Sequence, residues 1–256
     1  MKLGLKRFAA AASVFVVFFL AWELLCRALH VSDLVLPVPS QILLTLVQRF
    51  PDLWPHLMQT VTSTLIGFGL GVVVGVVLGG LIGSSRLAYD TLYPMLIAFS
   101  SVPKVAIIPI FVIWFGVGTV PAVLTAFALC VFPVVVNVAT GIAASDPELE
   151  DVLRVVGASR LDILLNVAWP RTLPYLFASL KVAITVAFIG SITSESIASN
   201  SGIGTVMMIA SANFDMALLF AGLAMISITG VVLYGLFSLA ETRLTGWSRR
   251  TNTPVG

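Results

Sequence analysis

The stretch VTSTLIGFGLGVVVGVVLGGLIG, residues 61–83, contains no charged residue. A helix that crosses a lipid bilayer needs about 20 mostly apolar residues, and this stretch is long enough. Glycine recurs in it at every fourth position, at Gly67, Gly71, Gly75, Gly79 and Gly83. Residues four apart lie on one face of a helix, so these glycines form a ridge that a neighbouring backbone can approach closely. We interpret this glycine ridge as tight packing inside one subunit, with a contact between subunits as the alternative.

Five further stretches have the same apolar character. Of 256 residues, 59% are hydrophobic and only 10% are charged, against roughly 25% charged in an ordinary soluble domain. This composition excludes a soluble protein, and the continuous apolar runs exclude a membrane β-barrel, whose strands alternate. The sequence therefore predicts an all-α integral membrane protein with six spans. They are residues 8–29, 61–83, 93–118, 120–144, 175–198 and 216–240.

The third predicted span is the least regular. Pro103, Lys104 and Pro109 interrupt it, and a proline inside a helix removes a hydrogen bond and bends or ends the helix. Residues 87–100 are therefore open to a second interpretation, in which they lie partly along the membrane surface.

The basic residues predict the orientation of the chain. Loops on the cytoplasmic side carry an excess of lysine and arginine. With the N-terminus inside, six spans return the C-terminus to the same side, and only Arg27 and Arg49 lie outside. The basic residues assigned to the cytoplasmic side are Lys2, Lys6, Arg7, Arg86, Arg154, Arg160, Arg171, Lys181, Arg243, Arg249 and Arg250. No A-x-A cleavage pattern follows the long apolar part of the first span, so we expect a retained signal anchor.

Two outer connections are too short to form separate domains. Residues 31–58 contain two prolines, followed by an amphipathic helix that we expect Ser40 to cap. Residues 199–215 form a Gly/Ser-rich break followed by a short apolar helix. We therefore expect one membrane domain over residues 1–256. Cys26 and Cys130 lie in apolar runs without metal-ligand spacing, and we expect both to be small core residues.

A charged, amphipathic segment stands between the predicted fourth and fifth spans. Residues 151–174 read DVLRVVGASRLDILLNVAWPRTLP, and the apolar positions of residues 148–166 follow a helical period. Asp146-Pro147 supplies a helix start. Gly157-Ala-Ser then permits a sharp turn, and Pro170 and Pro174 mark the entry to the fifth span. The pattern predicts two short helices joined by a tight turn on the cytoplasmic side.

This segment resembles the coupling loop of ABC importer permeases, in the branch that takes up taurine and other sulfonates, nitrate, bicarbonate and thiamine-precursor pyrimidines. That loop reads EAA, three residues, Gly, nine residues and Ile-x-Leu-Pro. Here Asp151-Val152-Leu153 stands at EAA, Gly157 at the glycine, Val167 at the isoleucine and Trp169-Pro170 at Leu-Pro. The glycine and the proline match, Asp keeps the charge of Glu, and the two alanines are replaced.

The resemblance extends over almost the whole chain, in the order that the family shows. Further similar segments are LPVPSQIL (36–43), VPKVAIIPIFVIWFGVG (102–118), GASR (157–160), LPYLF (173–177) and SESIASNSGIG (194–204). The resemblance implies a type I ABC importer permease fold in a bacterial inner membrane, with both termini in the cytoplasm.

The resemblance also implies a role for residues 145–174 as a coupling helix that docks on a separate ATPase subunit. It assigns this contact to Glu150, Asp151, Arg154, Gly157, Ala158, Ser159, Arg160, Pro170 and Pro174. The implied partners are two copies of the ATPase, a second copy of this permease and an external solute-binding protein. An interfacial helix that only anchors the chain is the alternative.

The chain lacks the parts of a catalytic site. It has no G-x-x-x-x-G-K-[ST] phosphate loop and no dinucleotide-binding fingerprint. His30 and His56 are isolated in the sequence, so metal or histidine-based catalysis is not supported. We expect no enzymatic activity and no cofactor in this chain, with ATP and Mg²⁺ used by the partner subunit.

Polar groups within membrane spans indicate the translocation pathway, because they are costly to bury in lipid. The candidates are Lys104, Asn137, Ser191, Ser194 and Glu195. Each has a second interpretation. Lys104 would place its ammonium at the cytoplasmic interface, Asn137 would bond a neighbouring helix, and Glu195 would be a hydrated carboxylate at the outer interface.

Lys104 and the resemblance favour a small anionic organic solute, such as a sulfonate or nitrate, and pyrimidines remain open. Two other classes of function are also open. A secondary transporter or channel would work without ATP, and a non-transporting scaffold would use residues 151–174 only for docking.

Overall fold

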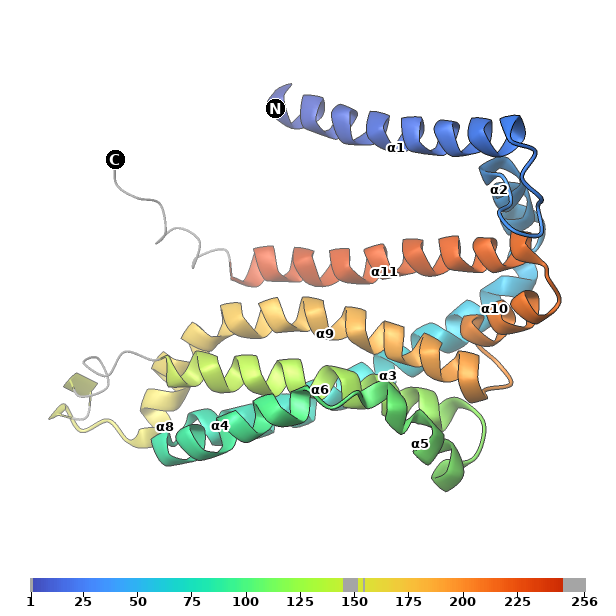
Figure 1. Cartoon of the computed structure of the whole chain (residues 1–256). Coiled ribbons are helices and arrows are strands. Elements are labelled where there is room, and N and C mark those ends of the chain that lie inside the picture. The colour runs from blue at the N-terminus through green and yellow to red at the C-terminus, as the bar shows by residue number, and fades with distance from the viewer. Residues whose placement is uncertain (1, 145–151, 154, 246–256) are drawn as a thin grey trace.

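The computed structural model describes residues 2–144, 152–153 and 155–245, with residues 2–12 and 160 described in backbone only. The described residues are helical, without strands. The helices are α1 (Lys2–Ala28), α2 (Pro39–Gln48), α3 (Phe50–Gly83), α4 (Arg86–Ser100), η1 (Lys104–Ile107), α5 (Ile108–Phe115), α6 (Thr119–Ala143), α8 (Arg160–Ile163), η2 (Leu164–Ala168), α9 (Trp169–Ala198), α10 (Ile203–Ala212) and α11 (Met216–Leu244). The long helices run side by side, with α2, α5 and α10 at one end and α8 at the other (Figure 1).

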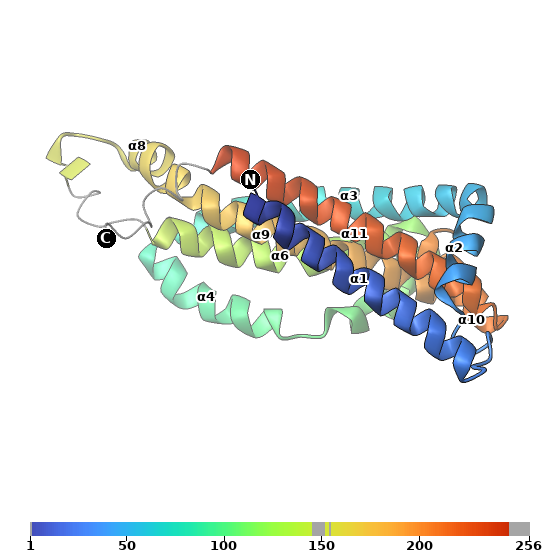
Figure 2. The same ribbon diagram turned by 90° about the horizontal axis from the view of Figure 1, so that it is seen from above.

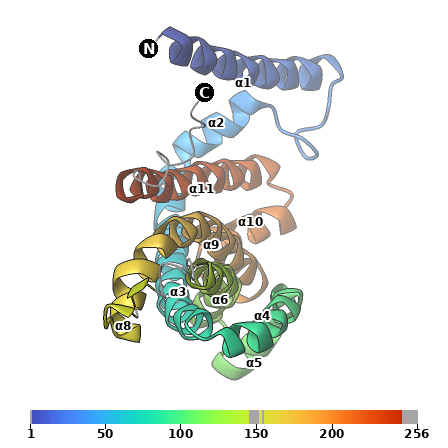
Figure 3. The ribbon, with the colours of Figure 1, turned by 90° about the vertical axis from the view of Figure 1, so that its left-hand side faces the viewer.

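Helices α3, α6 and α9 form the centre of the bundle, as the view along its axis shows (Figure 3). The buried core is built mainly from apolar side chains of α6 and α9, together with Phe68 of α3 and Leu233 of α11. Helix α1 lies apart from this core and passes obliquely over α11 (Figure 2). It contacts α2, and its Trp22 ring packs edge-on against Phe220 of α11.

The glycine ridge of α3 packs against α6, which confirms the interpretation of packing inside one subunit. A Cβ atom on Gly75 would lie 2.7 Å from the Val134 side chain. On Gly79 it would lie 2.8 Å from the Val135 carbonyl oxygen. Cys130 fills the position facing Gly71 and is completely buried, as expected of a core cysteine. The small residues therefore set the distance between the two helices.

Four helical stretches of the described chain are long and apolar enough to cross a membrane: α3, α6, residues Leu161–Ala198 and α11. Helix α4 and the η1–α5 pair would form a fifth, bent by 75°. This bend confirms the predicted interruption of the third span, since α4 ends at Ser100, just before Pro103. The first predicted span falls in α1 and is not among these candidates.

The segment between α1 and α3 differs from the expectation in its cap and its length. Ser40 does not cap α2, whose N-cap is Val38. The Glu23 carboxylate instead accepts hydrogen bonds from the Ser40 amide at 3.0 Å and the Ser40 hydroxyl at 2.8 Å. A carboxylate is a stronger acceptor than a hydroxyl, so it takes over the capping position. The helix that we expected within residues 31–58 corresponds to α2, which already ends at Gln48. Residues 50–58 belong to the next helix, α3.

Candidate functional site

The turn predicted at Gly157 is present. Val152, Leu153 and Val155 are helical, and the chain then turns with Gly157 at a φ of +91°. The Ala158 amide donates to the Leu153 carbonyl at 3.0 Å, which closes the turn. A positive φ is the backbone conformation that glycine adopts without steric cost.

A reciprocal cap starts α8 directly after this turn. The Ser159 hydroxyl accepts a hydrogen bond from the Asp162 amide at 3.2 Å, and the Asp162 carboxylate accepts one from the Ser159 amide at 3.0 Å. This is the arrangement of a capping box, with an aspartate in place of the usual glutamate. Helical residues thus lie on both sides of the predicted turn, and the remainder of the first predicted helix lies outside the described residues.

The hairpin, defined as residues 152–153 and 155–165, lies beyond the end of the bundle (Figure 1). Several of its apolar side chains are exposed. Val155 is 87% exposed. The exposed apolar residues of the hairpin are Val152, Val155, Val156, Leu161 and Leu165. A cluster of this kind indicates a surface that contacts another protein or the membrane. Of the predicted coupling residues, Glu150, Asp151 and Arg154 lie outside the described residues, and Arg160 is described in backbone only.

No loop separates the hairpin from the membrane helix that follows it. Helix α8 passes into the π-helical turn η2 and then into α9. Pro170 stands in the first turn of α9 and Pro174 one turn later. A proline cannot donate the backbone hydrogen bond of a regular helix, so the helical bonding is altered at Pro174. The π-helical turn η2 just before α9 is of a kind that frequently marks functional sites. The hairpin is thus joined mechanically to a helix that ends at Ala198, at the far end of the bundle (Figure 1).

Three of the predicted pathway residues lie together near that far end. Ser191, Ser194 and Glu195 follow one face of α9 and are at most 2% exposed. One oxygen of Glu195, Oε2, accepts a hydrogen bond from the Thr60 hydroxyl at 2.6 Å and lies 3.3 Å from the Gly204 amide nitrogen, also a donor. The other oxygen, Oε1, and the hydroxyls of Ser191 and Ser194 have no hydrogen-bond partner among the described residues. The described residues thus leave little of the carboxyl group exposed, and the assignment of Glu195 to the pathway or to a hydrated outer interface stays a prediction.

Sequence reasoning missed the α3 side of this cluster. The Thr60 hydroxyl accepts a hydrogen bond from the Ile203 amide at 2.9 Å. His56 is isolated in the sequence, but its Nδ1 accepts a hydrogen bond from the Gly202 amide at 3.2 Å. The spacing of His56 and Thr60, four residues apart on a helix, was the available signal. It did not identify the partner, which lies more than 130 residues away in the sequence.

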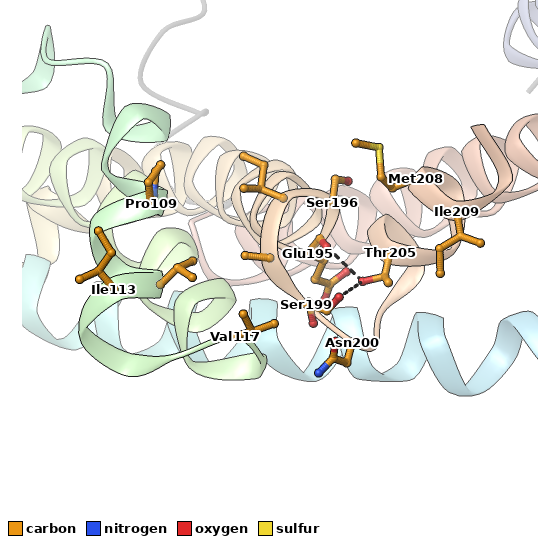
Figure 4. Close-up of a pocket in the computed structure, with 13 residues that line it drawn as sticks. Pro109, Ile113, Val117, Glu195, Ser196, Ser199, Asn200, Thr205, Met208 and Ile209 are labelled. Carbon is orange, nitrogen blue, oxygen red and sulfur yellow. Dashed lines mark hydrogen bonds between the residues drawn. The ribbon is translucent and has the colours of Figure 1, made fainter. Parts of the chain in front are cut away.

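A cavity of about 730 Å³ opens beside this cluster, between α5, the end of α9 and α10 (Figure 4). Its walls are mainly apolar, with neutral polar groups from the α9–α10 connection and from Thr205. The lining residues are Pro109, Val112, Ile113, Val117, Glu195, Ser196, Ile197, Ala198, Ser199, Asn200, Thr205, Met208 and Ile209. This lining contains no lysine or arginine.

Lys104 and Asn137 lie away from the cavity lining. The Lys104 ammonium donates to the Ser100 carbonyl at 2.8 Å and lies 4.7 Å from the centre of the Phe132 ring. It therefore stands at the bend between α4 and α5. Asn137 donates its side-chain amide to the Pro133 carbonyl of its own helix at 2.8 Å. A bond to a neighbouring helix, the second interpretation of Asn137, is not the hydrogen bond that this amide makes among the described residues.

Comparison with known sequences identifies a family over most of the chain. Residues 71–246 match the family described as "Binding-protein-dependent transport system inner membrane component". The match includes the hairpin, α9 and the Glu195 cluster apart from its α3 residues.

Individual relatives cover most of the chain. The riboflavin transport system permease protein RibX of Chloroflexus aurantiacus is 34% identical over 83% of this chain and 80% of its own length. The formylaminopyrimidine transport permease protein ThiX of Halalkalibacterium halodurans is 27% identical, over 92% of this chain and 94% of its own. The taurine transport system permease protein TauC of Escherichia coli is 28% identical, over 90% of this chain and 86% of its own length.

The fold is also similar to that of a solved transporter. A chain of the inward-facing MetNI methionine ABC transporter superimposes with a TM-score of 0.66 at 17% identity, over 76% of this chain and 98% of that one. At this identity the likeness concerns the fold alone, which is that of an ABC importer permease.

Proposed function

The chain belongs to the family of binding-protein-dependent transport system inner membrane components, the permease subunits of ABC importers, and from that premise we propose that it forms the pathway for a small organic solute and couples it to a separate ATPase. It is a multi-pass protein of the bacterial inner membrane and the non-catalytic component of its importer. In this proposal, ATP and Mg²⁺ are bound by the partner, and this chain holds no cofactor.

The hairpin is the observation that carries the coupling role. Its uncovered apolar side chains lie outside the bundle, and a rigid turn and a capping box fix their positions. A surface that only anchored the chain in lipid would not need a turn closed by a hydrogen bond and followed at once by a capping box. We assign the docking contact to the described residues Gly157, Ala158, Ser159, Pro170 and Pro174, together with Glu150, Asp151, Arg154 and Arg160.

The proposed assembly contains two copies of this permease, two ATPase subunits and an external solute-binding protein. Each copy would have six spans, with α1 as the first and the bent α4–η1–α5 unit as the third. Both termini would face the cytoplasm, because this orientation places the excess of basic residues inside. Closure of the ATPase pair on ATP would move the hairpins and open the pathway toward the binding protein.

The proposed pathway includes the outer cavity and the polar residues Ser191, Ser194 and Glu195 beside it, with Lys104 and Asn137 further along the bundle. A small anionic solute remains our proposal for the cargo, and it rests on Lys104, which uses one of its three N–H donors on Ser100. The names of the relatives extend the range to heterocycles such as formylaminopyrimidine and riboflavin.

Reconstituted vesicles test this function against a secondary transporter. The chain and its ATPase are placed in vesicles with ATP on the ATPase side and no ion gradient, and taurine, nitrate, riboflavin and a pyrimidine are each offered with the binding protein. We expect one of them to accumulate, and only when ATP and the binding protein are both present. Accumulation that follows a proton or sodium gradient without ATP would contradict the proposal.

A further inference from the structure

The Glu195 carboxyl group lies between three helices, and Glu195 also belongs to the lining of the cavity. It is 2% exposed, and its Oε2 is held by the Thr60 hydroxyl of α3 and the Gly204 amide of α10. A buried carboxyl group is costly unless protein groups bond it. Its position therefore indicates a role in holding helices together, since a solute in the cavity has little access to it.

The glycines after α9 allow α10 to lie directly on this carboxyl group. A Cβ atom on Gly202 would overlap the Glu195 carboxyl, and the φ of Gly202 is +106°. A Cβ atom on Gly204 would overlap the Ile192 carbonyl oxygen of α9. The sequence SGIG at 201–204 thus brings the first turn of α10 into backbone contact with the outer turn of α9.

The first amides of α10 are shared between α9 and α3. Gly202 donates to His56, Ile203 to Thr60 and Gly204 to Glu195. These amides have no partner inside their own helix, because the first turn of a helix leaves its N–H groups free. Thr60 also donates to Glu195, so one hydroxyl links all three helices.

Helix α10 separates two cavities. The cavity of about 730 Å³ lies on one side, and a second of about 350 Å³, which Arg49 and Asp52 help to line, lies on the other. Asn200, Thr205 and Ile209 border both. A movement of α10 relative to α9 would therefore change the walls of both cavities.

We propose that Glu195 is a positioning residue that fastens α10 to the outer end of α9, so that a movement of the cytoplasmic hairpin is transmitted to the wall of the outer cavity. Residues Leu161–Ala198 form one continuous helical stretch from the hairpin to this fastening. In this role Glu195 acts through α10, from its position beside the proposed pathway. This proposal rests on the proposed function, because it assigns the hairpin to an ATPase contact.

The test uses the assembled complex and a cysteine placed on α10 at Met208, which is 56% exposed and lines the larger cavity. The rate of maleimide labelling of the Met208→Cys chain is measured without nucleotide and with ATP plus vanadate. Native Cys26 and Cys130 are buried, and the chain without Met208→Cys gives the background. Recovery of the ATPase subunit and the rate of ATP hydrolysis are measured in parallel.

In the parent Met208→Cys chain, we expect the labelling rate without nucleotide to differ from the rate with ATP plus vanadate. When Glu195→Ala is added to this chain, the difference should disappear while assembly with the ATPase and ATP hydrolysis persist. Glu195→Gln keeps an acceptor for Thr60 and Gly204, so it should retain the difference. Asp215→Ala is the matched control: it removes an exposed carboxylate that caps α11 through the Leu218 amide at 3.0 Å, without contact to α10's first turn.

A nucleotide-dependent difference that persists in Glu195→Ala would overturn the proposal, as would its absence from a parent complex that hydrolyses ATP and takes up solute. If Glu195→Ala fails to assemble, Thr60→Val decides in its place, because it removes the same link with an isosteric side chain. A parent chain that binds no ATPase at all would overturn the proposed function, and the transmission with it.

Discussion

At the scale of single residues, Gly157 shows how one backbone conformation can place a whole surface. Its φ of +91° turns the chain between Val155 and α8. Among the described residues, and apart from the two chain neighbours, no atom lies within 4 Å of the position that a Cβ would take. The need for glycine therefore comes from the backbone and not from crowding inside this chain. A non-glycine residue in left-handed backbone costs roughly 1–2 kcal/mol.

We predict that Gly157→Leu leaves the protein in the membrane but lowers ATP-driven uptake about tenfold or more, since 1.4 kcal/mol corresponds to a factor of ten. Two effects act together, the strain at positive φ and a bulky side chain at the proposed docking surface. Gly157→Asn is the control, because asparagine tolerates this conformation better than other residues. Uptake is measured in vesicles at equal amounts of protein, and normal uptake by the leucine variant would refute the prediction.

At the scale of helices, the glycine ridge of α3 lets the core form without large interlocking side chains. Each ridge glycine faces backbone or Cβ atoms of α6, whereas Gly69 and Gly80, on other faces of the same helix, face open space. Lipid surrounds such a bundle, so close packing and not hydrophobic burial holds the helices together.

This difference predicts opposite outcomes for two neighbouring substitutions. Gly75→Ala forces a methyl group against Val134 and should lower stability by about 1–3 kcal/mol. Gly80→Ala meets nothing and should be neutral or stabilise by up to about 1 kcal/mol, because alanine favours helix more than glycine does. Thermal unfolding in one detergent compares the two, and equal melting temperatures would show that the ridge does not set the α3–α6 distance.

Features that depend on neighbouring residues were predictable from sequence, and features that join distant segments were not. The apolar runs, the break before Pro103 and the turn at Gly157 each follow from local rules of burial or backbone freedom. The Ser40 cap was predicted wrongly because α2 begins at Pro39, and Glu23, on another helix, accepts the hydrogen bonds of both the Ser40 amide and the Ser40 hydroxyl. The contact of Glu195 with Thr60 spans 135 residues, and no local pattern in either segment indicates it.

At the scale of the whole molecule, the proposed topology places the Glu195 cluster and the hairpin on opposite sides of the membrane. We predict that Asn200→Cys reacts with a membrane-impermeant maleimide in intact cells, because residue 200 borders the outer cavity. Ala158→Cys, at the hairpin, should react only after the membrane is opened. To remove the native thiols, Cys26 is first replaced by serine and Cys130 by alanine. The reverse pattern of labelling would invert the proposed topology.

The central claim is that the hairpin docks a separate ATPase, and purification of the tagged chain in a mild detergent tests it most directly. The account predicts that a soluble, ATP-hydrolysing subunit copurifies in stoichiometric amount with the parent chain. It should be lost when residues 151–165 are scrambled, and it should remain when the outer connection 31–36 is scrambled as a control. A chain that purifies without any ATPase, where a known transporter stays assembled, would contradict the account and favour a transporter that works without ATP.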